Sequence, residues 1–154
     1  MNATTHHDPP LSPAEAQALA ERCAEAMYAR DRASQGLGMQ VGKVGPGFAA
    51  MTMTVRADML NGHATCHGGF IFALADSAFA YACNSHNQVA LATSCMIDFL
   101  SPGQIGDVLA AEATEQNLRG RFGVYDIRVT NQKGELIALF RGKSAQLKDQ
   151  VVPA

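Results

Sequence analysis

The fold of this 154-residue chain is decided by one segment, residues 68–83, which reads GGFIFALADSAFAYAC. Its side chains are apolar nearly all the way round a helix, and a helix of that kind is buried on most sides. At a rise of 1.5 Å per residue it is about 24 Å long, which is long enough to pass through a small domain and too short to span a bilayer. The segment predicts a central helix from Gly68 to about Cys83 that is wrapped by the rest of the chain.

The segments on both sides of this helix have the composition of strands. Short links that contain glycine separate them, as expected between antiparallel neighbours. Upstream, Ser12-Pro13-Ala14-Glu15 has the residues of a capping box and predicts a further helix to about Arg32. The chain therefore predicts an α+β fold in which a five- to six-stranded antiparallel sheet wraps one long central helix, with an extra N-terminal helix. The expected strands are residues 36–44, 48–55, 89–99, 108–117, 122–130 and 136–147.

Length and composition predict one cytoplasmic domain. With 47% hydrophobic residues the chain can form one core and is too short for two ordinary domains, so we expect a flexible tail over residues 1–11 and a single domain over 12–149. Neither a signal sequence nor an apolar run of about 20 residues is visible, which argues against a membrane. Four cysteines without CxxC spacing suit reduced thiols. A net charge of −2 without a basic stripe argues against nucleic acid as a partner.

Asp76 is the one formally charged side chain between Asp58 and Asp98, and it lies within the apolar helix. Burying a carboxylate is costly, so the residue needs a reason to be there. One alternative is structural, with Asp76 bonded to Ser77 or to the backbone. However, a desolvated carboxylate has a raised pKa and greater basicity, which suits the activation of water or attack on a carbonyl. We predict that Asp76 is catalytic.

The sequence His67-Gly68-Gly69 stands where the central helix begins. The N-terminus of a helix offers unpaired N–H donors and the positive end of the helix dipole, and glycine lets a carbonyl approach the backbone. An oxyanion hole is one interpretation, and a simple turn is the other. Gly68 and Asp76 are eight residues apart, or about 12 Å along one helix, so they cannot both touch one thioester carbonyl. If both are catalytic, Gly68 of one subunit meets Asp76 of another in a two-fold dimer.

The stretch NGHATCHGG at residues 61–69, followed by Leu74-Ala75-Asp76, resembles the hot-dog-fold acyl-CoA thioesterases of the phenylacetic acid degradation (PaaI-type) family. The resemblance continues through residues 79–85, 97–100, 123–126 and 138–144 and covers most of the chain after Ser34. It implies a thioester hydrolase that converts phenylacetyl-CoA or hydroxyphenylacetyl-CoA to free CoA and the acid in aromatic catabolism. Coenzyme A is then part of the substrate, and no separate cofactor is expected. The resemblance also implies a homodimer with shared active sites and a homotetramer of two dimers.

The resemblance further implies roles for individual residues. Asp76 would activate water or attack directly, and the Gly68 N–H would polarise the thioester carbonyl. Asn61 would help to hold the thioester or water across the dimer interface, and Ser94 would hydrogen-bond the water. By composition alone, Asn61 is also the first residue of an Asn-Gly turn, and Ser94 is also an ordinary strand hydroxyl.

Four further residues are candidates for contact with the substrate. His67 and Gly69 belong to the loop that starts the helix. Arg141 and Lys143 lie near a strand end and could meet the phosphates of CoA, because charge-assisted bonds to phosphate favour Arg. The alternative for both basic residues is a simple solvated position.

Three rival interpretations of the chain remain. His63, Cys66 and His67 suggest a metal site, but structural zinc needs four ligands and no second pair is offered, so we predict no metal. A non-catalytic acyl-CoA-binding module of the same fold is possible, although the retained Asp76 argues against it. A hot-dog hydratase or dehydratase would need a histidine base beside a carboxylate, and His67 lies more than two helical turns from Asp76.

Overall fold

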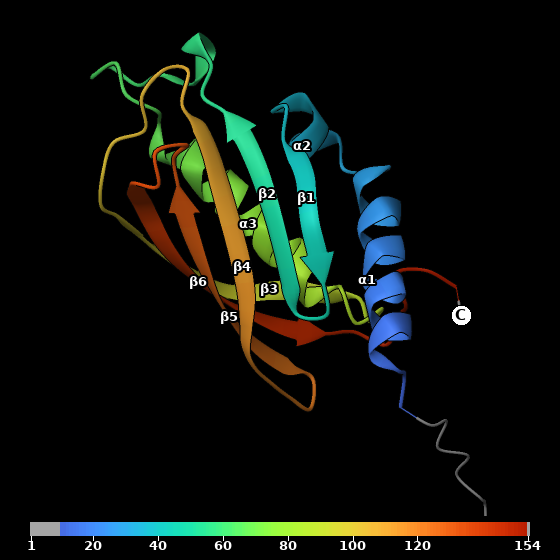
Figure 1. Ribbon diagram of the computed structural model, residues 1–154. Helices are drawn as coiled ribbons and strands as arrows, with labels where there is room; N and C mark the ends of the chain where they lie inside the picture. The colour runs from blue at the N-terminus through green and yellow to red at the C-terminus, as the bar shows by residue number, and fades with distance from the viewer. Residues whose placement is uncertain (1–9, 154) are drawn as a thin grey trace, which may run out of the picture.

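The computed structural model describes residues 10–153, in which one antiparallel sheet wraps along one side of a long helix (Figure 1). Six strands form the sheet in the order β1-β2-β4-β5-β6-β3. This arrangement confirms the predicted α+β hot-dog fold and its extra N-terminal helix. The elements are α1 (Pro13–Tyr28), α2 (Arg32–Gly36), β1 (Gln40–Gly45), β2 (Phe48–Thr54), a 3-10 turn (Ala57–Met59), α3 (Gly68–Cys83), β3 (Ala90–Phe99), β4 (Val108–Arg119), β5 (Phe122–Thr130) and β6 (Leu136–Gln146).

The predicted N-terminal helix starts as expected and ends earlier. Ser12 and Glu15 form the capping box, with the Ser12 N–H donating to Glu15 Oε2 at 2.8 Å. The helix stops at Tyr28 rather than Arg32, because Asp31 caps a second short helix by accepting a hydrogen bond from the Ser34 N–H at 2.9 Å. Residues 36–39, predicted as strand, therefore end that helix and lead into β1. Of the predicted tail, residues 1–9 lie outside the described residues.

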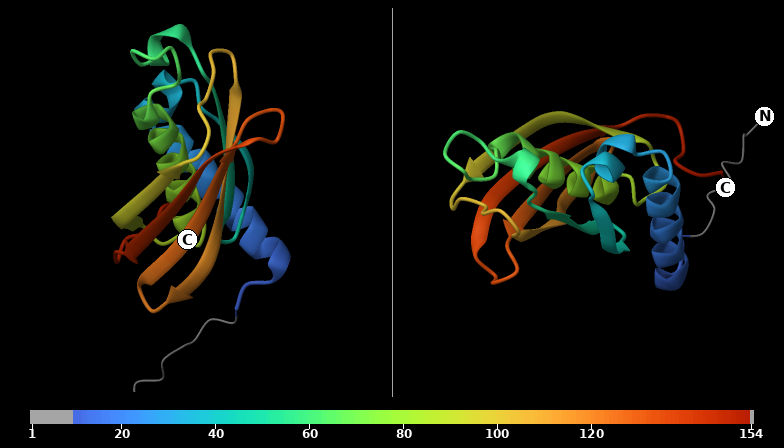
Figure 2. Two further views of the ribbon diagram at one scale, coloured as in Figure 1. Left: turned by 90° about the vertical axis from the view of Figure 1, so that its left-hand side faces the viewer. Right: turned by 90° about the horizontal axis from the view of Figure 1, so that it is seen from above.

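The core lies between α3 and the concave face of the sheet. Both views of Figure 2 place α3 against one face of the sheet, with α1 beside β1. Alternate residues of the central strands are buried against α3, as period-two burial in a strand requires. Phe79 packs so closely on β6 that a Cβ at Gly142 would stand 2.8 Å from its ring. Glycine at this position lets the helix settle onto the sheet.

One side of α3 is not fully covered. The prediction that this helix is buried on most sides holds for eight of its 16 residues. The partly exposed or exposed residues are Gly68, Gly69, Phe70, Phe72, Ala73, Asp76, Ser77 and Ala80. No helix among residues 10–153 is long and apolar enough to cross a membrane. The open side of α3 leaves space for another surface.

The edge strand β3 runs antiparallel along α3. Phe99 lies on Gly68 at one end, Cys95 contacts Asp76 in the middle, and Ala90 exchanges hydrogen bonds with the Asn84 side chain at the other end. Within the described residues, β3 pairs with β6 only, so its other edge is unpaired. Large apolar side chains along or beside this edge are more than half exposed; they are Leu91, Met96, Phe99 and Leu100.

Candidate active site

The N-terminus of α3 presents one free backbone donor. His67 is the N-cap, and its Nδ1 accepts a hydrogen bond from the Gly69 N–H at 3.0 Å. The Phe70 N–H donates to the His67 carbonyl at 2.9 Å. Within residues 10–153 the Gly68 N–H donates to no acceptor. The cap therefore uses Gly69 and leaves Gly68, at the positive end of the helix dipole, as the available donor.

A pocket of about 390 Å³ opens at this end of α3 and contains both Gly68 and Asn61. Asn61 holds the turn over residues 61–65, because its Oδ1 accepts hydrogen bonds from the His63 and Thr65 N–H groups at 2.9 and 3.3 Å. The predicted Asn-Gly turn is confirmed, and the same turn brings Asn61 beside Gly68. The pocket is lined by Asn61, Thr65, Cys66, Gly68, Ile71, Phe99, Leu100, Ser101 and Pro102.

Asp76 is partly buried between α3 and β3. The Cys95 thiol lies 3.8 Å from Asp76 Oδ1, and no other hydrogen bond to this carboxylate is found within residues 10–153. The structural alternative of a bond to Ser77 is wrong, because the Ser77 hydroxyl contacts Ser34 Oγ at 3.3 Å instead. Within residues 10–153 the Asp76 carboxylate therefore has neither a backbone hydrogen bond nor an ion-pair partner, and it is available to act as a base or a nucleophile.

Burial sets the protonation behaviour of Asp76 and Cys95. Desolvation raises the pKa of Asp76, and the hydrogen bond from Cys95 offsets part of that rise. In turn, burial and then the charge of Asp76 raise the pKa of Cys95 to about 11. The thiol is therefore a protonated donor at neutral pH. Sequence reasoning missed Cys95, although its place in the predicted strand after the helix was a signal.

Ser94 is not brought to Asp76. In the β3–β6 register Ser94 lies opposite Lys143 and Cys95 lies opposite Gly142, and opposite residues share a face of the sheet. Cys95 faces α3, so its neighbour Ser94 faces the outer side with the exposed Lys143. The irregularity between Ala92 and Ser94, at Thr93, shifts the register at this point.

Arg141 is also on the outer face and already has a partner. Its Nε and Nη2 donate to the two carboxylate oxygens of Asp126 at 2.6 and 2.8 Å. This pairing lowers the pKa of the Asp126 carboxyl. The predicted phosphate contact would have to compete with this bidentate ion pair. Lys143 lies two residues further along the same strand, on the same face, and is exposed.

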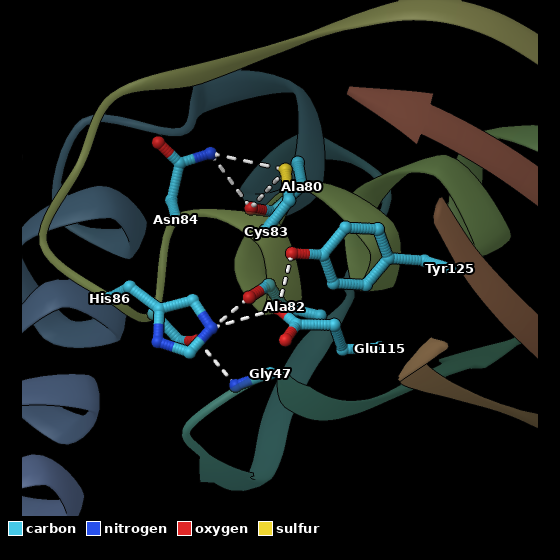
Figure 3. Close-up of polar contacts among 9 residues, drawn as sticks. Gly47, Ala80, Ala82, Cys83, Asn84, His86, Glu115 and Tyr125 are labelled. Carbon is cyan, nitrogen blue, oxygen red and sulfur yellow. Dashed lines mark hydrogen bonds and ion pairs between the residues drawn. The ribbon is translucent and has the colours of Figure 1, made fainter. Parts of the chain in front are cut away.

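A second polar cluster lies at the far end of α3 (Figure 3). Glu115 Oε2 accepts a hydrogen bond from the Tyr125 hydroxyl at 2.6 Å and lies 2.8 Å from His86 Nε2. The neighbouring Ser85 hydroxyl donates to the Ala82 carbonyl at 2.7 Å and accepts from the Gly47 N–H at 2.8 Å. The cluster has the residue types of a catalytic triad, but its serine is occupied by the backbone. We assign a structural role to this cluster, because its hydrogen bonds connect the end of α3 to the β1–β2 turn and to β4.

A single chain thus contains two separate half-sites. One holds Asn61 and the free Gly68 N–H, and the other holds Asp76 and Cys95. Eight residues of α3 separate Gly68 from Asp76, or about 12 Å at 1.5 Å per residue. Asp76 does not line the pocket that contains Gly68. One thioester carbonyl cannot reach both half-sites of the same chain.

Comparison with known proteins finds similarity to thioesterases. The family model for the thioesterase superfamily matches residues 63–138. The acyl-coenzyme A thioesterase PaaI of Escherichia coli K12 is 52% identical over 124 residues, which cover 80% of this chain and 89% of that protein. A structure of the E. coli PaaI protein from the phenylacetic acid degradation operon superposes with a TM-score of 0.86 at 48% identity, covering 87% of this chain and 97% of that chain. A mutant of the phenylacetic acid degradation protein PaaI from Thermus thermophilus superposes with a TM-score of 0.71 at 43% identity, covering 74% of this chain and 97% of that chain.

Proposed function

Because this chain belongs to the thioesterase superfamily, and within it to the hot-dog acyl-CoA thioesterases of the PaaI type, we propose that it hydrolyses phenylacetyl-CoA or hydroxyphenylacetyl-CoA to free CoA and the arylacetic acid. One observation carries the proposal for the site. The unpaired Gly68 N–H and the partly buried Asp76 lie eight residues apart on α3, beside the unpaired edge of β3.

A two-fold dimer would join the two half-sites. A second copy whose β3 lies antiparallel beside the first extends the sheet and covers the open side of α3. On α3 the two-fold axis would pass near Phe72, midway between Gly68 and Asp76. On β3 it would pass near Ile97, midway between Cys95 and Phe99. Gly68 and Asn61 of one subunit then meet Asp76 of the other. The exposed apolar side chains along this edge support such an interface.

The chemistry of the joined site follows from its donors and its base. The thioester carbonyl accepts a hydrogen bond from the Gly68 N–H, which stabilises the negative charge that develops on the carbonyl oxygen. Asp76 takes a proton from water as the water attacks, or attacks the carbonyl itself and is released by water afterwards. The carbon–sulfur bond breaks, and the CoA thiolate leaves and is protonated. Ser94 has no part in this scheme, because its side chain is on the outer face.

The proposal is tested by thiol release from phenylacetyl-CoA and from aliphatic acyl-CoAs, comparing wild type with Asp76→Asn. Asn keeps the shape of Asp and removes its charge, so we expect kcat to fall at least about 10²-fold. Asp149→Asn is the matched control, because Asp149 is exposed and lies after the end of β6, outside both α3 and β3. If wild type binds these thioesters and releases no thiol, the chain is a binding module and the proposal fails.

Single-turnover hydrolysis in ¹⁸O water separates the two roles of Asp76. Label in the Asp76 carboxylate would show that it is the nucleophile and would end the general-base alternative. The homotetramer remains a prediction that the mass of the protein in solution would test.

A further inference from the structure

We propose that Phe99 determines the acyl selectivity of this site by forming an aromatic wall beside the carbonyl-binding glycine. The inference rests on the proposed thioesterase function and adds a residue that selects the substrate. It starts from the close contact between the end of β3 and the start of α3.

The Phe99 ring lies directly on the Gly68 backbone. A Cβ placed on Gly68 would stand 2.9 Å from Phe99 Cζ and 3.2 and 3.4 Å from its two Cε atoms. Only a residue without a side chain allows the ring to approach this closely. Phe99 is paired with Ala138 of β6 and shares the inner face of the strand with Cys95. Phe99 is nevertheless 53% exposed in the single chain and lines the pocket that contains Gly68, so the part of the ring that faces this pocket can meet a ligand.

The pocket beside the ring has the character of an acyl site. Ile71, Leu100 and Pro102 add apolar surface to that of Phe99, and the volume is about 390 Å³. The free N–H of Gly68 and the side chain of Asn61 are among the polar groups of the pocket lining. This combination of an apolar cavity and a few polar groups is typical of a small-molecule site.

The position of the donor constrains what the acyl group must touch. The Gly68 N–H and the atoms under the ring tip belong to the same residue, so a carbonyl bound at this N–H brings its substituent next to Phe99. An arylacetyl group carries its ring one methylene from the carbonyl, so we expect this ring to pair with the Phe99 ring at the centroid separation of about 4.5–7 Å that aromatic pairs prefer. Such a pair is worth a factor of about 2 to 10 beyond burial of apolar area. An aliphatic chain of similar size gains the area and lacks the pair.

The test is the ratio of kcat/KM for phenylacetyl-CoA to that for hexanoyl-CoA in wild type, Phe99→Leu and Phe99→Ala. Leu keeps an apolar side chain and removes the ring, so we expect the ratio to fall about 2- to 10-fold in Phe99→Leu, with hexanoyl-CoA turnover changed less than about twofold. Phe122→Leu is the matched control, because Phe122 is 61% exposed at the β4–β5 turn and does not line the pocket. Its ratio should equal that of wild type.

A second readout does not need turnover. The dissociation constants of non-hydrolysable phenylacetyl and hexanoyl thioethers of CoA should show the same loss of preference in Phe99→Leu. An unchanged ratio in both assays would overturn the inference, as would an equal loss for both substrates, which would indicate a general structural role. Failure of wild type to hydrolyse any thioester is a different result and counts against the proposed function instead.

Discussion

The Gly68 N–H can be deleted without removing the helix that carries it. Gly68 is the first residue of α3, and proline is favoured at this position because it lacks an N–H that the helix does not use. The chain already places Pro13 at the start of α1. His67 has φ −61° and ψ 131°, the extended conformation that a residue before proline adopts. Gly68→Pro should therefore keep α3 and remove the donor.

Gly68→Ala is the control for the added Cβ. Both variants introduce a Cβ at a position 2.9 Å from Phe99 Cζ, and in both the half-exposed ring must move aside. The alanine variant keeps the N–H. Loss of one oxyanion-hole donor lowers kcat by about 10²–10³, or about 2.7–4 kcal/mol of transition-state stabilisation. We expect a difference of this size between the two variants, whatever their shared loss relative to wild type.

The assay is kcat for thiol release from phenylacetyl-CoA, with thermal unfolding measured in parallel to show that both variants are folded. If the kcat of Gly68→Pro lies within about threefold of that of Gly68→Ala, the N–H does not stabilise the transition state. Gly68 would then serve only to let Phe99 approach the helix.

Three further changes have distinct expected outcomes. Activity that needs the Asp76 carboxylate is lost as the pH falls through its raised pKa. Cys95→Ala removes a hydrogen bond that lowers this pKa, so the acid limb of the kcat/KM profile should move to higher pH. An acid limb that stays in place or moves to lower pH would contradict the contact between Cys95 and Asp76. Ser94→Ala should keep kcat within about twofold of wild type, because the side chain lies on the outer face, and a loss near that of Asp76→Asn would show that the β3 register is wrong. Gly47→Ala should lower the free energy of unfolding by roughly 1–3 kcal/mol in a denaturant titration, because Gly47 has φ +68° and an added Cβ would stand 2.8 Å from Glu115 Cβ. Gly62→Ala is the control: an added Cβ there has no atom within 4 Å, so the free energy of unfolding should change far less.

The bounds of the central helix could be predicted closely because its signals are local. Apolar side chains all round the helix require burial, glycines mark its start, and polar residues follow Cys83. The end of the N-terminal helix could not be predicted as well. It depends on Asp31, whose side chain caps the next helix and also accepts a hydrogen bond from the Tyr81 hydroxyl at 3.2 Å, a contact 50 residues away in the sequence.

The residues of the candidate site also differ in whether local sequence features reveal them. Asp76 and Gly68 are visible in the sequence because a lone charge in an apolar helix and a glycine at a helix start are local features. Ser94 and Cys95 depend on the register of β3, where one irregularity at Thr93 decides which residue faces α3. The partner of Arg141 depends on the β5–β6 register, which places Asp126 opposite it. No local pattern in the sequence contains this information.

A mixed dimer tests most directly whether two subunits share each site. Asp76→Asn and Gly68→Pro chains with different tags are co-expressed, and the dimer that carries both tags is isolated and assayed for thiol release. In a shared site one of the two sites is intact and the other carries both changes, so the mixed dimer should have about half the activity of wild type while each parent variant is nearly inactive. If the mixed dimer is as inactive as its parents, each site lies within one chain and the shared-site arrangement is wrong.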